Sequence, residues 1–304
     1  MTSTTFLLAQ LFNGLSTTSI LLLIALGLAI TFGVMGVINM AHGELMMLGA
    51  YSAYVLQNIF VKYLPEHYFG YYFLVALPVA FVTAGLAGWL LERTLIRRLY
   101  GRPLETLLAT WGISLILQQL MRQTFGANNV EVRSPGWLTG QLSAGAGLEF
   151  PYLRLFIIAF TALSITLVYM LLFRTSLGLK IRAVTQNRAM SAALGIRTRK
   201  VDAYTFALGS GLAGLAGCIL SLMGSVGPTT GQNYIVDAFM VVVLGGVGKL
   251  AGAIAGSFAI GEFNTLLESF STATMGKVLV FALVILFLQW KPSGMFPPKV
   301  RSLD

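Results

Sequence analysis

RTSLGLKIRAVTQNRAMSAALGIRTRKVD, residues 174–202, is the longest polar stretch with a helical pattern in an otherwise apolar chain. It carries seven basic residues and a single acid, Asp202. Small apolar residues at 189, 190 and 192–194 predict one face of a short amphipathic helix. That helix should end at Gly195, the residue type that favours a left-handed C-cap. A membrane protein that keeps such a helix on one side is expected to dock a partner there.

The composition outside this stretch predicts a membrane protein. The chain has 304 residues, of which 56% are hydrophobic and only 10% are charged, with a mean hydropathy of +0.80. A soluble chain of this length needs more charge to cover its surface. We therefore expect an all-α, polytopic transmembrane bundle that forms a single domain over residues 1–304, with the polar stretch, residues 174–202, as its cytoplasmic loop.

The positive charge is concentrated in two loops. The net charge is +9, and eleven of the twenty basic residues lie in residues 92–103 and 174–202. This clustering follows the positive-inside rule and assigns both loops to the cytoplasm. No interleaving of aromatic and basic residues supports nucleic-acid binding, so we expect the lipid bilayer, and no nucleic acid, as a partner.

Runs of about 20 apolar residues are long enough to cross the hydrocarbon core. Six regular spans and three less regular segments, some of them short enough to be re-entrant, predict eight or nine passes. An odd number of passes agrees with an uncharged N-terminus outside and a C-terminus that Lys291, Lys299 and Arg301 hold inside. The predicted segments are Leu11–Gly33, Ala41–Phe60, Gly70–Leu91, Leu104–Thr124, Tyr152–Phe173, Ala203–Met223, Ala238–Val247, Leu250–Leu267 and Lys277–Trp290.

This topology predicts outside loops at Val61–Phe69, Gly126–Pro151, Gly224–Asp237 and Glu268–Gly276. The longest loop is too rich in Gly, Ser and Asn to build a domain. It can form a surface for a partner or serve as a solvated connector.

Two segments break an apolar run with glycines and then resume a helix of small residues. They are Gly33–Tyr51 and Leu244–Gly261. A pair of interrupted segments in corresponding positions of two halves is typical of a translocation path. Glycines can instead allow helices to pack closely, which is the interpretation we favour for residues 209, 211, 214 and 217.

The sequence contains no recognisable motif for catalysis or for metal binding. There are two histidines, one cysteine (Cys218) and no HExxH, GxSxG or CxxC motif, so no catalytic or metal-ligating residue is predicted. The GxxxxGK[ST] phosphate loop is also missing. If transport consumes ATP, a partner subunit binds it, and this chain needs no cofactor.

Polar and ionisable residues at membrane depth are costly, and each is a candidate for the translocation path. A carboxylate near a helix start, such as Glu44, also has a purely structural explanation, because it interacts favourably with the helix dipole. The candidates of this kind are Asn39, His42, Glu44, Glu262 and Asn264.

A polar stripe marks the predicted span 104–124. Thr110, Ser114 and Gln118 are spaced by four residues and share one helix face, with Trp111 beside it. Uncharged hydroxyl and amide groups suit a small neutral solute. Contacts between helices explain the same stripe equally well.

Several separate motifs resemble the permease subunits of ATP-binding-cassette (ABC) importers of the branched-chain amino acid family. Side-chain choices such as Met40, Trp111 and the pair Gln118–Gln119 look closest to the branch that transports urea. The motifs are INMAHGELMMLGAY (38–51), RPLETLLATWGISLILQQ (102–119), VTQNRAMSAALGI with RTRKVDA (184–203) and VGPTTGQNYIVDAFMVVVLGGVG (226–248).

The resemblance implies a heterodimer with a second permease, cytoplasmic ATP-binding subunits and an extracytoplasmic solute-binding protein, in a bacterial inner membrane. It also implies that the docking stretch couples this chain to the ATPase. The residues that we expect there are Arg182, Asn187, Arg188, Ala192, Ala193 and Gly195.

Three functions follow in order of preference: an ABC importer of urea, an ABC importer of branched-chain amino acids, and a passive channel for small polar solutes. A zwitterionic amino acid requires charged groups or helix ends at its site, whereas amide and hydroxyl groups are enough for urea. A channel has no use for a docking helix.

Overall fold

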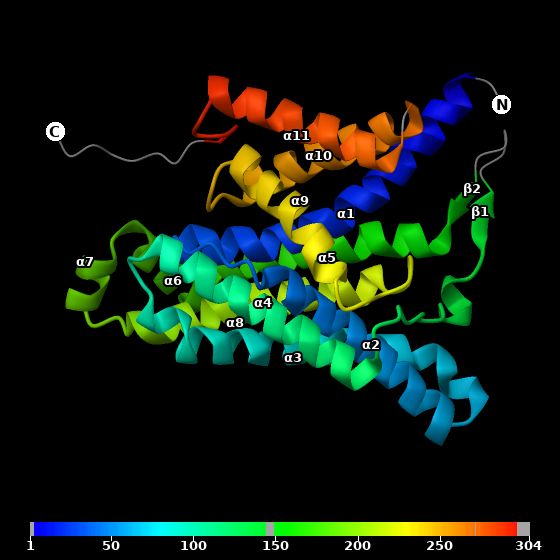
Figure 1. Cartoon of the computed structure of the whole chain (residues 1–304), viewed down its shortest axis with the longest axis horizontal. Coiled ribbons are helices and arrows are strands. Elements are labelled where there is room, and N and C mark those ends of the chain that lie inside the picture. Colours follow the sequence, from blue (N-terminus) through cyan, green and yellow to red (C-terminus); the bar gives the residue numbers. More distant parts are fainter. Residues whose placement is uncertain (1–2, 144–148, 271, 297–304) are drawn as a thin grey trace.

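The computed structural model describes residues 3–143, 149–270 and 272–296, and these residues form a bundle of long helices (Figure 1). The long helices are α1 (Ser3–Met35), α2 (His42–Tyr63), α3 (Tyr72–Thr94), α4 (Pro103–Phe125), α5 (Tyr152–Arg174), α8 (Thr198–Leu220), α9 (Thr230–Gly245), α10 (Leu250–Phe270) and α11 (Ala273–Trp290). The shorter elements are η1 (Glu66–Tyr71), η2 (Ile96–Arg98), η3 (Gly136–Leu138), α6 (Ser176–Gln186), α7 (Arg188–Ala193) and an antiparallel strand pair, β1 (Gln141–Ser143) with β2 (Glu149–Pro151). The expected all-α polytopic architecture is confirmed.

Five helical segments are long and apolar enough to cross a membrane by length and composition. Helices α2 and α4 are missing from this set because polar residues lower their hydropathy. The exact number of passes therefore stays a prediction. The five segments are Leu8–Met35, Glu66–Arg98, Tyr152–Arg174, Thr198–Leu220 and Leu250–Phe270.

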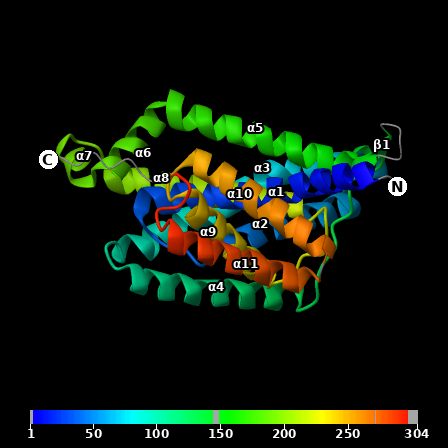
Figure 2. The same cartoon turned by 90° about the horizontal axis from the view of Figure 1, so that it is seen from above.

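The polar segments lie at two opposite ends of the bundle. Helices α6 and α7 lie at one end, which we call the basic end, and α11 finishes there at Trp290 (Figure 1). The N-terminus and the strand pair lie at the other end, which we call the hairpin end (Figures 1 and 2). This arrangement agrees with the predicted loop positions. Lys299 and Arg301, on which the C-terminal orientation partly rested, lie outside the described residues.

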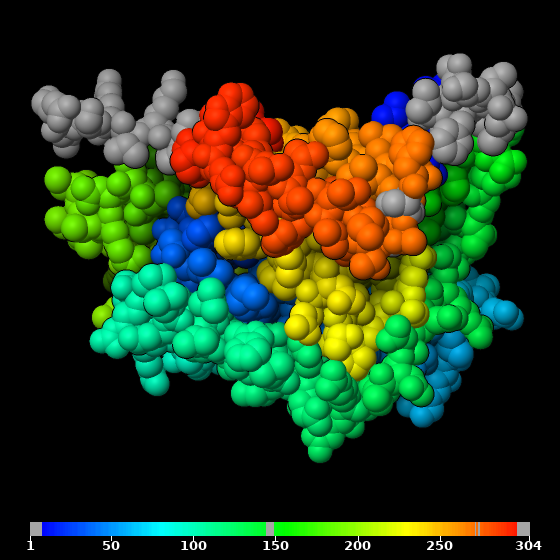
Figure 3. Space-filling model, turned by 45° about the horizontal axis from the view of Figure 1, so that its top comes forward, coloured from blue at the N-terminus to red at the C-terminus, as the bar shows by residue number. Residues whose placement is uncertain are grey.

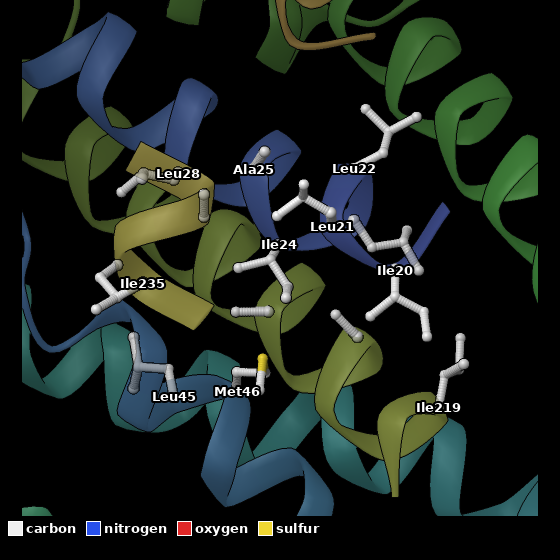
Figure 4. Packing of buried hydrophobic residues seen from close by; sticks show 14 of the residues in the cluster. Ile20, Leu21, Leu22, Ile24, Ala25, Leu28, Leu45, Met46, Ile219 and Ile235 are labelled. Carbon is white, nitrogen blue, oxygen red and sulfur yellow. The ribbon is translucent and has the colours of Figure 1, made fainter. Parts of the chain in front are cut away.

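Helix α8 forms the centre of the bundle and packs against α1, α2 and α3. Its glycines allow this approach: a Cβ atom added to Gly217 would lie 1.8 Å from the Met46 carbonyl oxygen of α2. One added to Gly209 would lie 2.6 Å from the Gly27 carbonyl oxygen of α1. The interpretation of these glycines as packing residues is confirmed, and the apolar side chains of α1, α2 and α9 close around them (Figure 4).

Two outer helices flank this core. Figure 2 shows α4 and α5 along opposite sides of the bundle, where α4 contacts α2 and α5 contacts α1. Both helices leave large apolar side chains exposed, such as Leu108 and Ile116 on α4 and Leu163 and Leu167 on α5. These surfaces suit lipid or another membrane subunit.

The segment Gly224–Asp237, expected as an outside loop, is largely helical. Helix α9 begins at Thr230 and continues to Gly245, so the short predicted span Ala238–Val247 is only its apolar half. The other half, TGQNYIVD, is polar and escapes a hydropathy criterion. The first half of α9, by which the chain returns to the bundle, is therefore polar.

The two glycine-broken segments meet in space. The breaks fall between α1 and α2 and between α9 and α10, and a Cβ atom added to Gly33 would lie 2.2 Å from the Gly248 Cα atom. Gly33 belongs to the last turn of α1, so the irregular α9–α10 connection packs directly against the end of this helix. The internal repeat itself stays a prediction.

Gly217→Ala should destabilise the bundle, because the new methyl group would collide with the α2 backbone. Overpacking of this kind costs about 1–3 kcal/mol. We expect a melting temperature several degrees lower in detergent. Gly112→Ala, on α4, is the matched control, since no described atom lies within 4 Å of the added methyl group. Equal melting of the two variants would show that α8 is not tightly packed.

Candidate functional site

The polar stripe of α4 faces α2 and binds a buried carboxylate. Glu44, on the first turn of α2, is 1% exposed. Its Oε1 atom accepts hydrogen bonds from Ser114 Oγ at 3.0 Å and from Gln118 Nε2 at 2.8 Å. The sequence offered two explanations for the stripe, solute binding and contact between helices. The structure shows contact between α4 and α2.

The break before α2 is held by further polar contacts. Thr110 Oγ1 accepts a hydrogen bond from the Met40 backbone N–H at 3.1 Å, which ties this break to α4. Asn39 is buried, and its Oδ1 atom accepts from the Ala41 N–H at 3.1 Å. His42 is fully buried with Nε2 3.1 Å from the Ile24 carbonyl oxygen of α1. These residues fix the start of α2.

Trp111 does not belong to this cluster. Its neighbour Thr110 is buried, but one residue along a helix turns the side chain by about 100°. Trp111 is consequently 49% exposed, on the same outer surface of α4 as Leu108 and Leu115. Trp111 thus lies beside the stripe but outside the Glu44 cluster, and its role in the translocation path stays a prediction.

The two candidates on α10 lie in different surroundings. Glu262 is 8% exposed and packs into the notch at Gly14 of α1, where a Cβ atom would lie 2.3 Å from Oε2. Asn264, two residues further on, lines a cavity on another side of the helix. The predicted path residues therefore form separate groups and no single site.

That cavity has several polar and charged residues in its wall. It has a volume of about 480 Å³ and lies among α1, the end of α8, the first turns of α9, α10 and the start of α11. Asp237 of α9 and Lys277 of α11 form an ion pair in its wall, with Nζ 3.1 Å from Oδ2. We call it the outer cavity, because it is lined by the α8–α9 connection, which lies in the segment predicted as an outside loop.

Sequence reasoning missed this ion pair. It assigned Asp237 to a loop and treated Lys277 as the start of a span. The spacing of Asn233 and Asp237, four residues apart, would have been the available signal for a polar helix face. Nothing in the sequence indicates that α9 packs against α11.

The expected docking helix is present at the basic end as α7. Asn187 caps it, with Oδ1 accepting from the Met190 N–H at 2.9 Å, and Gly195 follows it with a φ of +82°. Met190 and Leu194 are 59% and 76% exposed. Helix α7 lies at the end of the bundle (Figure 2), and these two apolar side chains are exposed there.

Two of the basic coupling candidates are engaged within the chain. Arg182 lies over the Phe173 ring, 4.9 Å from its centroid, beside an 850 Å³ groove between α1 and α7. Arg188 forms two hydrogen bonds to the fully buried Asp202 of α8, one of them 3.3 Å between Nη1 and Oδ1. Arg188 therefore anchors α7 within the chain, because a buried carboxylate needs a paired cation. Its part in coupling to an ATPase stays a prediction.

This pair belongs to a larger cluster that joins the two basic loops. The Arg188 guanidinium lies 4.6 Å from the centroid of the Tyr100 ring, and Glu92, also fully buried, pairs with Arg97 at 3.2 Å. Burial and the nearby carboxylates of Asp202 and Glu92 raise the pKa of the Tyr100 hydroxyl above its usual range, so it stays protonated. The cluster anchors α7 to α8 and to the end of α3.

Comparison with known proteins gives a consistent result. A family model described as "branched-chain amino acid transport system / permease component" matches residues 10–288. The chain is 31% identical to the high-affinity branched-chain amino acid permease LivH of Escherichia coli K12, over 98% of each chain. It is 30% identical to BraD of Pseudomonas aeruginosa, over 97% of this chain and 98% of BraD.

The second permease named for the same E. coli transport system, LivM, is 26% identical over 92% of this chain and 68% of LivM. No solved structure matches the chain.

Gln118→Leu should destabilise the protein, because it removes one of the two donors to the buried Glu44 carboxylate. Loss of a hydrogen bond to a buried charge costs about 1.5–3 kcal/mol. Gln119→Leu is the matched control, since the neighbouring side chain is exposed. Melting in detergent should separate the two. Unchanged melting with an altered KM of uptake would instead assign the Gln118 amide to the solute.

Proposed function

This chain belongs to the family of permease components of branched-chain amino acid transport systems, and from that premise we propose that it is the membrane-spanning subunit of an ABC importer that takes up branched-chain amino acids. It is a multi-pass helical membrane permease and no enzyme. The observation that carries the proposal is the similarity to LivH over nearly the whole of both chains.

The preferred solute changes from urea to a branched-chain amino acid. The urea assignment rested on a few side chains of α4, and the structure uses Ser114 and Gln118 to bind Glu44. The relatives compared above are named for branched-chain amino acids. An opposite pair of charges in a cavity wall, Asp237 with Lys277, also suits a zwitterion better than it suits urea.

We propose that a second, similar permease completes the path. The chain resembles both LivH and LivM, which are named as permeases of one transport system. Figure 3 shows a face on which α4 and α11 stand on either side of a hollow floored by α9 and by residues near the α1–α2 break. Met40, Phe239 and Phe281 line an apolar pocket there. A second membrane subunit would cover this face.

The basic end is proposed to face the cytoplasm and to receive the ATP-binding subunits. Its basic loops follow the positive-inside rule, and the exposed apolar side chains of α7 offer a contact for a groove in the ATPase. The N-terminus then lies outside, where a separate solute-binding protein would deliver the solute. A passive channel leaves the exposed surface of α7 without a role.

The test is uptake by the transporter reconstituted with its partner subunits in proteoliposomes. We expect ATP-dependent uptake of labelled leucine that unlabelled valine and isoleucine inhibit and urea does not. Uptake of labelled urea with no uptake of leucine would overturn the assignment. Leucine movement down its gradient without ATP would favour the channel.

Ala192→Glu should abolish uptake, because it adds a carboxylate to the exposed apolar face of α7. We expect at least a tenfold loss of ATP-dependent uptake, and loss of the ATPase subunit on copurification, with unchanged membrane insertion. Lys180→Glu, an exposed position on the neighbouring helix α6, is the matched control. Normal uptake by the Ala192→Glu transporter would remove α7 from the coupling surface.

A further inference from the structure

The outer cavity combines charges of both signs with an apolar wall. Asp237 and Lys277 form its ion pair, and the side chains are 10% and 47% exposed, so the pair is open to solvent on the lysine side. Leu21 of α1 and Leu220 of α8 contribute apolar surface to the same cavity. Its volume of about 480 Å³ is within the usual range for sites that bind small molecules.

One face of α9 supplies three polar side chains to the cavity wall. Thr230, Asn233 and Asp237 all line the cavity, from the first helical residue to the third turn. The first N–H groups of a helix have no partner within it and attract anions. The side chain of the N-cap residue, Thr229, forms no capping hydrogen bond with the described first turn of α9. An anion position at the helix start is thus followed by a carboxylate at Asp237.

A further polar atom points to a ligand. The Asn264 Oδ1 atom of α10 is buried and has no hydrogen-bond partner among the described residues, and Asn264 lines this cavity. A buried polar atom without a partner costs free energy, which a bound donor such as an ammonium group would recover. The Glu44 cluster also contains buried polar atoms without a partner among the described residues, such as Glu44 Oε2 and His42 Nδ1. It differs from the outer cavity because Glu44 is bound by the neutral Ser114 and Gln118 side chains and not by a basic residue.

We propose that the outer cavity is a binding site for the zwitterionic head and aliphatic side chain of an α-amino acid on its way through the permease. The solute carboxylate lies between the start of α9 and Lys277. Its ammonium group lies at Asp237, toward which the Asn264 amide turns when the solute binds, and the Glu268 carboxylate of α10 also lines the cavity. The aliphatic side chain packs on Leu21 and Leu220. This inference rests on the proposed function and adds to it the place in the chain where the solute binds.

The ion pair explains how such a site stays stable without solute. In the free protein Asp237 and Lys277 satisfy each other, which avoids a buried unpaired carboxylate. A zwitterion can separate them and pair with each in turn. A solute without either charge leaves one of them unpaired, so the site selects for amino acids over their neutral or singly charged analogues.

The experiment measures leucine uptake by the reconstituted transporter with Asp237→Asn, Lys277→Gln and the charge exchange Asp237→Lys/Lys277→Asp. Loss of one charged contact should raise the KM for leucine roughly 10- to 100-fold. Competition by leucinamide, which lacks the carboxylate, and by 4-methylpentanoate, which lacks the ammonium group, identifies the role of each residue. Lys277→Gln should lose discrimination against leucinamide, and Asp237→Asn against 4-methylpentanoate.

Asn233→Ala is a milder variant, because this side chain is exposed and its loss leaves no cavity in the core. We expect a KM several-fold higher. Lys62→Gln on α2 is the control away from the cavity and should transport like the wild type. Two results would overturn the site. The first is a wild-type KM and wild-type discrimination in Asn233→Ala, Asp237→Asn and Lys277→Gln. The second is recovery of the wild-type KM and discrimination in the charge exchange, which would show that the ion pair is purely structural. A wild-type transporter that takes up no branched-chain amino acid would overturn the proposed function, and the site with it.

Discussion

The close approach of α8 to its neighbours is the contact on which the rest of the bundle depends. Lipid is as apolar as leucine, so helices in a membrane gain little from hiding apolar side chains from each other and associate through close packing. Glycines on α8 bring its backbone against the carbonyl groups of α1 and α2, as at Gly209 with Gly27 and Gly217 with Met46. Buried polar residues such as Glu44, Ser114 and Gln118 are then held in place between packed helices.

Helix α8 also connects the two functional ends. Its first turns contain Asp202, which holds Arg188 and thereby anchors the docking helix α7. Its last residue, Leu220, lines the outer cavity. The helix has 23 residues and is therefore roughly 34 Å long. If α7 is the ATPase contact and the outer cavity the solute site, as proposed above, one rigid helix connects them, and coupling needs no chain of small side-chain movements.

How much the sequence could predict depended on the distance between the residues that interact. The capped docking helix is local: Asn187 and Gly195 lie at its two ends, and both were identified. The stripe of α4 was also found, because a spacing of four residues defines a helix face. Its partner Glu44 is 70 residues away from Ser114 in sequence. The sequence therefore could not show whether the stripe binds a solute or contacts another helix. The pairing of Asp237 with Lys277 was invisible for the same reason, and hydropathy misplaced the start of α9 because that start is polar.

The polar start of α9 is possible only because its surroundings satisfy the backbone. The connection after α8 is irregular, and irregular backbone inside a membrane protein must bond to protein or line a water-filled space. Val226 exchanges two backbone hydrogen bonds with Val130, at 2.8 and 2.9 Å, and the Gly227 N–H donates to Thr230 Oγ1 at 2.8 Å. These bonds satisfy the connection up to α9. The helix N–H groups that follow point the positive end of the dipole toward the outer cavity, where Asp237 and Lys277 already stand as a pair. The interruption after α8 therefore places the start of a helix beside this ion pair, in the wall of one cavity.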